Sequence, residues 1–118
     1  AVNNRCVKSH EYIFLFTKSK QYYFNADAIK IKDVRRSSVW TFNTASLKEA
    51  HFAVFPNELP ALCIKAGSRE GDTVLDPFMG SGTTALVAQE LGRKWIGIEL
   101  NPEYIEIIKR RTAQTQLF

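Results

Sequence analysis

The feature that most constrains the fold is a glycine-rich turn between a predicted strand and a predicted helix. The strand is the short apolar run at residues 73–76, and the helix is predicted from about residue 83 to residue 91. The turn contains Gly80 and Gly82, which bend the backbone tightly and leave main-chain atoms open to a ligand. In open α/β sheets, ligands bind beyond the carboxyl ends of parallel strands, so this turn is the first candidate for a binding site.

The remainder of the second half continues the same alternation. A helix is predicted over residues 58–66, with Asn57 as its N-cap. A second strand is predicted over residues 95–99, and a last helix begins at Pro102 with Asn101 as its cap. Helix, strand, helix, strand and helix in this order predict an α/β fold with a parallel sheet and right-handed crossovers.

The first half has a different character. Residues 11–17 are aromatic and β-branched without a polar interruption, which is typical of a strand buried on both faces. A polar turn and a second extended stretch follow, so we predict an N-terminal β-hairpin over residues 11–25, and a loop at the charged residues 35–38. The chain is expected to divide into a hairpin and connector region, 1–50, and a ligand-binding α/β portion, 51–118.

Charge is distributed unevenly between the two portions. Residues 1–50 contain nine Lys or Arg against four Asp or Glu, whereas residues 51–118 contain seven against eight. A basic surface attracts a polyanion through Coulomb steering and counterion release. Nucleic acid is therefore a reasonable partner of the first portion, and a solvated surface is the alternative.

Composition excludes several other classes of protein. No apolar run approaches the length of a membrane span, and the N-terminus leads into no signal-peptide pattern. Cys6 and Cys63 stand far apart and outside any metal-ligand spacing. We expect a cytoplasmic protein with free thiols, no metal site and no membrane association.

Acidic residues end both predicted strands. Asp76 directly precedes the glycine turn, where it would repel a pyrophosphate and attract the cationic group of an amino acid. Glu99 ends the next strand, 19 positions after Gly80, a spacing suited to accepting hydrogen bonds from ribose hydroxyls. An acid that faces an ammonium group, together with an acid that faces a ribose, describes a site for S-adenosylmethionine.

Other interpretations of the turn were weighed. A P-loop is improbable because no lysine follows the glycines. A dinucleotide site of a nicotinamide-dependent oxidoreductase stays open, since Ala85 fits the looser form of that fingerprint. A purely structural turn, with a helix-capping Asp76 and a surface Glu99, is the third alternative.

These segments resemble a known family. Residues 76–84 (DPFMGSGTT) and 97–104 (GIELNPEY) look like motifs I and II of the amino-group DNA methyltransferases, which methylate adenine N6 or cytosine N4. Residues 51–56 (HFAVFP) look like motif X, which precedes motif I in the β group of that family. Residues 10–19 resemble the motif VIII region, and residues 36–40 resemble the segment that re-enters the fold after the target-recognition region. The resemblance implies a partial Rossmann-like S-adenosylmethionine-dependent methyltransferase sheet.

The resemblance also implies roles for individual residues. The methionine side of the cofactor would be surrounded by turn residues, namely Asp76, Pro77, Phe78, Gly80, Ser81, Gly82, Thr83 and Thr84. Glu99 would bind the ribose, and Asn101 or Pro102 would lie beside the adenine. The motif X side would be closed by His51, Phe52 and Phe55. Phosphates of double-stranded DNA would be contacted by Lys30, Lys32, Arg35 and Arg36.

One motif of the family is missing. Its catalytic motif IV contains two adjacent prolines, and its polar and aromatic groups hold the flipped target base. The four prolines here, Pro56, Pro60, Pro77 and Pro102, are never adjacent, so no catalytic residue is assigned. We expect this chain to be the C-terminal, cofactor-binding part of a site-specific DNA methyltransferase, inactive alone; the alternative is a catalytically incomplete remnant or a regulatory S-adenosylmethionine-binding module. The sequence does not decide between adenine and cytosine, or between a restriction-modification and a solitary role.

The missing part has a structural consequence. In the family, strands of that part lie between the motif I strand and the motif VIII hairpin. We therefore expect this chain to expose an edge of the strand at 73–76 and both faces of residues 13–16, which is an aggregation hazard. Proper folding is expected only with a complementary N-terminal segment that carries the catalytic motif, or through self-association.

Overall fold

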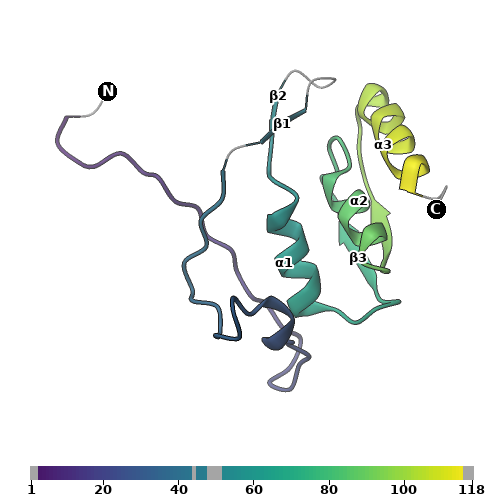
Figure 1. Ribbon diagram of the computed structural model, residues 1–118. Helices are drawn as coiled ribbons and strands as arrows, with labels where there is room; N and C mark the ends of the chain where they lie inside the picture. The colour runs from purple at the N-terminus through teal and green to yellow at the C-terminus, as the bar shows by residue number, and fades with distance from the viewer. Residues whose placement is uncertain (1–2, 44, 48–51, 116–118) are drawn as a thin grey trace.

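A computed structural model of the chain describes residues 3–43, 45–47 and 52–115 of the 118. Helices and strands alternate in its second half as α1 (Glu58–Gly67), β3 (Thr73–Asp76), α2 (Thr83–Glu90), β4 (Lys94–Gly97) and α3 (Pro102–Thr115) (Figure 1). β3 and β4 pair in parallel, with Asp76 opposite Gly97. The predicted α/β class and the parallel sheet are therefore confirmed.

The ends of the helices follow from local sequence, with one correction. Pro102 opens α3, and Oδ1 of Asn101 accepts a hydrogen bond from the Glu103 N–H at 3.0 Å, so Asn101 caps this helix as predicted. Asn57 precedes α1, but its side chain makes no capping hydrogen bond. Its backbone is already helical, with φ −58° and ψ −27°, whereas a capping side chain needs an extended backbone.

The first half differs from the prediction of a hairpin over residues 11–25. Within residues 3–43 the backbone forms one short 3-10 helix, η1 (Asp27–Ile29), and one isolated β-bridge, between Ile31 and Val34. The predicted hairpin is wrong as a pair of strands, because two extended segments without further strands or a helix to pack against are only marginally stable. An antiparallel pair that we did not predict lies further on, between β1 (Ala45–Leu47) and β2 (Phe52–Val54).

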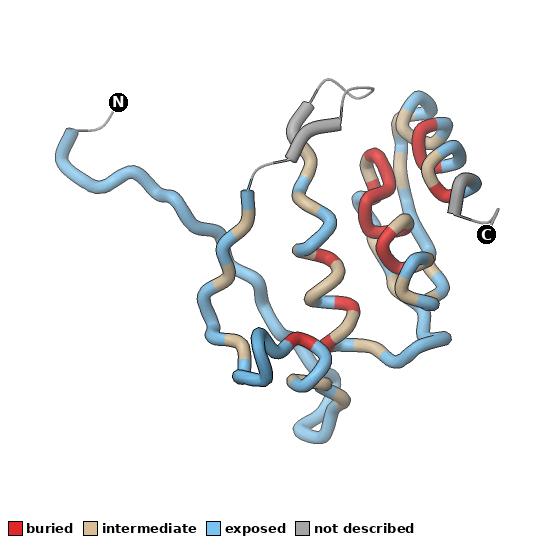
Figure 2. The backbone as a smooth tube through the Cα atoms, in the orientation of Figure 1, coloured by how far each residue is buried: buried red, intermediate tan, exposed pale blue. Residues whose placement is uncertain are grey.

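The N-terminal arm, residues 3–24, runs along the outside of the molecule and is almost entirely exposed (Figure 2). Phe14 stacks on Tyr12 and on Phe16, with ring centroids 6.1 and 5.7 Å apart, yet Phe16 is 85% exposed. The predicted exposure of residues 13–16 is confirmed. The arm also accounts for a radius of gyration of 16.2 Å, against about 13.5 Å for a compact chain of this length.

Within the described residues, the parallel sheet is covered on one face only. Val74 and Trp95 pack against the buried side chains of Ile64, Val87 and Ala88, which belong to α1 and α2. On the opposite face Leu75 and Ile96 are more than half exposed. Parallel strands in folded domains are normally covered on both faces, so this surface is suited to pack against further polypeptide.

The two glycines of the turn serve different purposes. Both have a positive φ, +57° at Gly80 and +90° at Gly82. A Cβ at Gly80 would meet open space, whereas a Cβ at Gly82 would lie 2.8 Å from Cγ1 of Ile108 in α3. Gly80 is therefore required by the backbone conformation alone, and Gly82 also by the close packing of α3.

We expect Gly82→Ala to destabilise the fold by about 2 to 4 kcal/mol, because the left-handed backbone and the contact with Ile108 both oppose the new methyl group. Gly80→Ala, the matched control, is expected to cost only about 1 kcal/mol from its backbone conformation. Urea unfolding of the two variants measures the difference. Equal losses of stability would show that Ile108 does not limit the space at Gly82.

Candidate functional site

The candidate site is built where β3 and β4 end. Because the strands are parallel and in register, Asp76 ends β3 beside Gly97, the last residue of β4, and Glu99 follows two positions later. The turn then runs back along the extension of β4, since the Met79 N–H donates to the Ile98 carbonyl at 2.9 Å. This geometry brings both carboxylates to one turn.

Glu99 holds the middle of that turn. Its Oε2 accepts a hydrogen bond from the Gly80 N–H at 2.7 Å, and its Oε1 accepts one from the Asn101 N–H at 2.9 Å. The Asn101 N–H, followed by those of Gly80 and Leu100, lowers the pKa of Glu99 below its ordinary value, against the opposing effect of desolvation. Glu99 is therefore an ionised carboxylate at neutral pH, fixed in orientation by the backbone.

Asp76 holds the turn on both sides of the Gly80 contact. Its Oδ1 accepts a hydrogen bond from the Phe78 N–H at 3.0 Å, and its Oδ2 accepts one from the Thr84 hydroxyl at 2.7 Å. A carboxylate offers about four lone-pair positions, so both Asp76 and Glu99 retain capacity to accept hydrogen bonds from a ligand. The hydrogen bonds within the turn therefore do not use every acceptor position of either carboxylate.

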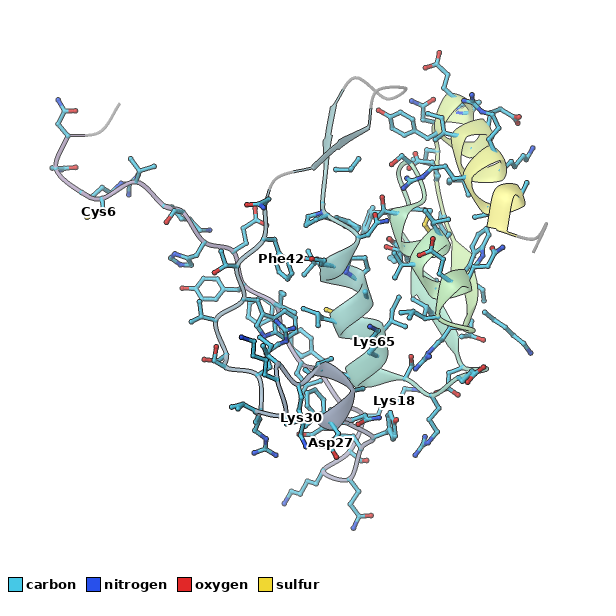
Figure 3. All side chains as sticks on the ribbon, viewed as in Figure 1. Cys6, Lys18, Asp27, Lys30, Phe42 and Lys65 are labelled. Carbon is cyan, nitrogen blue, oxygen red and sulfur yellow. The ribbon has the colours of Figure 1, made fainter. Side chains whose placement is uncertain are left out.

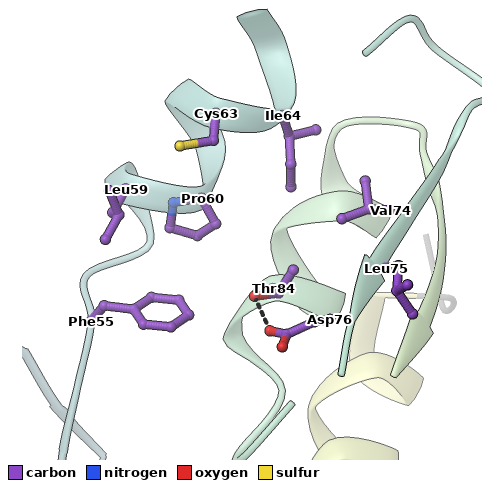
Figure 4. Close-up of a pocket in the computed structure, with 9 residues that line it drawn as sticks. All are labelled: Phe55, Leu59, Pro60, Cys63, Ile64, Val74, Leu75, Asp76 and Thr84. Atoms are coloured by element: carbon purple, nitrogen blue, oxygen red, sulfur yellow. Dashed lines mark hydrogen bonds between the residues drawn. The ribbon is translucent and has the colours of Figure 1, made fainter. Parts of the chain in front are cut away.

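A groove of about 310 Å³ adjoins Asp76, between α1 and β3 (Figure 4). Its walls are mostly apolar, and its polar groups include the bonded pair of Asp76 and Thr84. The lining residues are Phe55, Leu59, Pro60, Cys63, Ile64, Val74, Leu75, Asp76 and Thr84. Glu99 and Gly80 do not line the groove. The turn that contains Gly80 begins directly after Asp76, which does line it. The groove therefore suits a ligand with an apolar part and a positive charge near Asp76.

The other predicted site residues differ in how far they are exposed to solvent. Phe78 is 88% exposed, and Pro77 beside it is exposed as well. Ser81 and Thr83 are buried in the turn. His51 lies outside the described residues, and only the backbone of Phe52 is described, as part of β2.

One residue that sequence reasoning missed contacts the turn from behind. Nη1 of Arg111 in α3 donates to the Ser81 carbonyl at 2.9 Å, and lies 3.2 Å from both Ser81 Oγ and Thr83 Oγ1. The apolar spacing of residues 102–115 predicts a helix, but it does not tell which neighbouring loop a polar residue of that helix reaches. No signal in the sequence would have identified this contact.

The four predicted DNA contacts surround η1 and the tight turn after it. Lys30 forms an ion pair with Asp27 at 2.7 Å (Figure 3), and Nε of Arg36 donates to the Ile29 carbonyl at 2.9 Å. Lys32 and Arg35 are exposed, Lys32 within the two-residue turn closed by the Ile31–Val34 bridge. Two of the four cations thus support local structure, and two project into solvent.

Two other kinds of site were searched for in the described part of the chain. No group of three His, Cys, Asp or Glu side chains there is arranged to hold a metal ion. Among the same residues, no helix combines the length and the apolar character needed to cross a membrane.

Comparison with known proteins places this geometry in a family. The family model N6_N4_Mtase, described as DNA methylase, matches residues 1–110. The type II methyltransferase M.SmaI of Serratia marcescens is 48% identical to the chain, and the match covers 94% of this chain and 40% of the relative. The type II methyltransferase M.Cfr9I of Citrobacter freundii is 47% identical, with 94% and 39% covered. The chain thus spans about two fifths of the length of these relatives.

Solved structures give the same result. The PvuII DNA methyltransferase (cytosine-N4-specific) superposes with a TM-score of 0.72 at 28% identity, over 81% of this chain and 38% of that one. The M1.HpyAVI–SAM complex superposes with a TM-score of 0.57 at 33% identity, over 77% and 44%. With the family model covering most of the sequence, the chain belongs to the N6_N4_Mtase family of DNA methylases.

Proposed function

We propose that this chain is the cofactor-binding portion of a site-specific DNA methyltransferase, which transfers a methyl group from S-adenosylmethionine to the exocyclic amino group of adenine (N6) or cytosine (N4). The observation that carries the proposal is that Asp76 and Glu99 both bind one glycine turn, Glu99 at the Gly80 N–H and Asp76 at the Thr84 hydroxyl. Membership of the family supports this function over a nicotinamide-dependent oxidoreductase. Structures of similar proteins include a SAM complex and a cytosine-N4-specific enzyme.

The residues present fit this cofactor. Asp76 offers a carboxylate to the ammonium group of the methionine moiety, and the apolar groove beside it offers Phe55 and Pro60 to the methylene chain. Glu99 retains lone pairs for the ribose hydroxyls, with Asn101 beside the adenine. When bound, S-adenosylmethionine supplies an electrophilic methyl group on its sulfonium. The chain's own contribution is to orient that group with two charged side chains held rigidly by the backbone.

The target base requires groups from elsewhere. The sequence contains no adjacent prolines of the motif IV kind, and the chain spans about two fifths of its relatives. We infer that a complementary N-terminal segment supplies that motif and packs on the open face of the sheet, at Leu75 and Ile96. The exposed cations Lys32 and Arg35 would then contact DNA phosphates, which position a duplex without reading its sequence.

Asp76→Asn is expected to weaken S-adenosylmethionine binding by about 1 to 3 kcal/mol, because the amide keeps the shape of the side chain and removes its charge. Asp72→Asn is a matched control: Asp72 lies just before β3, outside the groove, and accepts a hydrogen bond from the Arg69 N–H at 2.8 Å. Calorimetric titration gives both affinities. An unchanged affinity in Asp76→Asn would remove Asp76 from the cofactor site.

Glu99 gives the protein an acid-sensitive contact. Its folded-state pKa lies below the ordinary value, so the stabilisation from its ionised form is complete above the unfolded-state pKa and is lost as the pH falls through the folded-state pKa. The difference in unfolding free energy between the wild type and Glu99→Gln should be largest at neutral pH and shrink in that acidic window. Urea unfolding at a series of pH values measures it; a difference independent of pH would contradict the ionised contact.

The open surfaces predict how the isolated chain behaves in solution. Exposed aromatic and aliphatic side chains on the N-terminal arm and on the sheet should cause concentration-dependent self-association. Co-expression with the N-terminal three fifths of a type II relative should replace the aggregates by a defined complex. Analytical ultracentrifugation distinguishes the aggregates from the complex. Ile96→Glu, which places a charge on the open face of the sheet, is expected to weaken the complex. A concentration-independent monomer would argue against a missing segment.

A further inference from the structure

The glycine turn is held from two sides, and the side away from the carboxylates is held by α3. The residues of the turn divide between the two sides: Gly80 and Thr84 bond to Glu99 and Asp76, whereas Ser81 and Thr83 bond to Arg111. Ser81 and Thr83 are only 3% and 2% exposed, so their bonds to the guanidinium are shielded from water. One cation therefore supports the rear of the same turn whose front carries the two acids.

A second contact of α3 with the turn comes from the same face of the helix. Ile108 lies three residues before Arg111, so the two side chains are neighbours on the helix surface. Ile108 packs with Met79 and Ala85, and its side chain fills the space that a Cβ at Gly82 would need. The apolar contact sets the distance between α3 and the turn, and Arg111 adds directional hydrogen bonds at that distance.

We propose that Arg111 is a positioning residue of the cofactor site, which acts through the turn and keeps Gly80 and Thr84 aligned on Glu99 and Asp76. This inference rests on the proposed function. Arg111 lies one residue beyond the segment matched by the family model. A guanidinium suits the task because it stays charged and presents several donors in a fixed plane. Without it, the buried Ser81 carbonyl and Thr83 hydroxyl would lose a charged partner.

The test compares three variants of the chain, each in the complex that it forms with the co-expressed N-terminal segment. Arg111→Met is expected to weaken S-adenosylmethionine binding roughly tenfold, and Arg111→Lys by less, since the ammonium keeps the charge but not the planar donors. Thr112→Val is the control, because it removes the buried bond from the Thr112 hydroxyl to the Ile108 carbonyl and so destabilises α3 without touching the turn. Calorimetry and urea unfolding are run on each. Unchanged affinity in Arg111→Met, or an equal loss in Thr112→Val, would overturn the proposal.

Coupling with the turn gives a second readout. Thr83→Val removes one acceptor of Arg111, so its effect on affinity should be smaller in the Arg111→Met background than alone. Full additivity of the two substitutions would contradict a shared contact. Should Arg111→Met fail to fold, Arg111→Lys takes its place in the cycle with the same expected sign.

Hydrogen exchange separates this proposal from the proposed function. In Arg111→Met, the amides of Phe78 and Gly80 should exchange at least about tenfold faster, while the Ser68 amide at the end of α1 keeps its rate. If the wild type does not bind S-adenosylmethionine, the proposed function fails, and these exchange rates still decide whether Arg111 holds the turn. If the wild type binds and the exchange rates are unchanged, the role of Arg111 is refuted and the proposed function stands.

Discussion

The in-register parallel pairing of β3 with β4 is the constraint on which the candidate site depends. Because Asp76 lies opposite Gly97, both strands end at the same level, and Glu99 reaches the turn that begins at Asp76. The Ile98 N–H donates to the Asp76 carbonyl at 3.0 Å, which extends the pairing past the end of β4. A slip of one residue would turn the side chains of one strand to the other face and separate the two acids.

The chain's own side chains hold the turn in place. Its N–H groups and hydroxyls are bound by Asp76 and Glu99 at the front and by Arg111 behind, and every fully buried polar side-chain atom in the described part of the chain has a hydrogen-bond partner. A turn restricted by the protein's own hydrogen bonds has less conformational freedom to lose when a ligand binds, so more of the contact energy is available as affinity.

Sequence reasoning succeeded where the signal was local. The turn glycines, Pro102 and Asn101 mark the ends of elements through their own backbone preferences, and the predicted strand at 73–76 has the bounds of β3. Sequence reasoning failed where the structure of a segment depends on another segment that packs against it. Residues 11–17 have the composition of a strand but no neighbouring strand in the described chain, and the contact of Arg111 depends on how α3 is rotated against α2. Glu99 was predicted to face a ligand, and its hold on the Gly80 backbone was not foreseen.

One part of the molecule has its polar groups paired and its apolar groups buried, and another part leaves apolar surface exposed. The hydrogen bonds of the turn are donated and accepted within residues 76–111, and Met79, Ala85 and Ile108 bury its rear. The apolar surface left open lies elsewhere, on the N-terminal arm and on the face of the sheet that carries Leu75 and Ile96. Under the proposed function, this division means that the cofactor contacts are encoded within the chain. The groups that hold the target base come instead with the polypeptide that covers the open face.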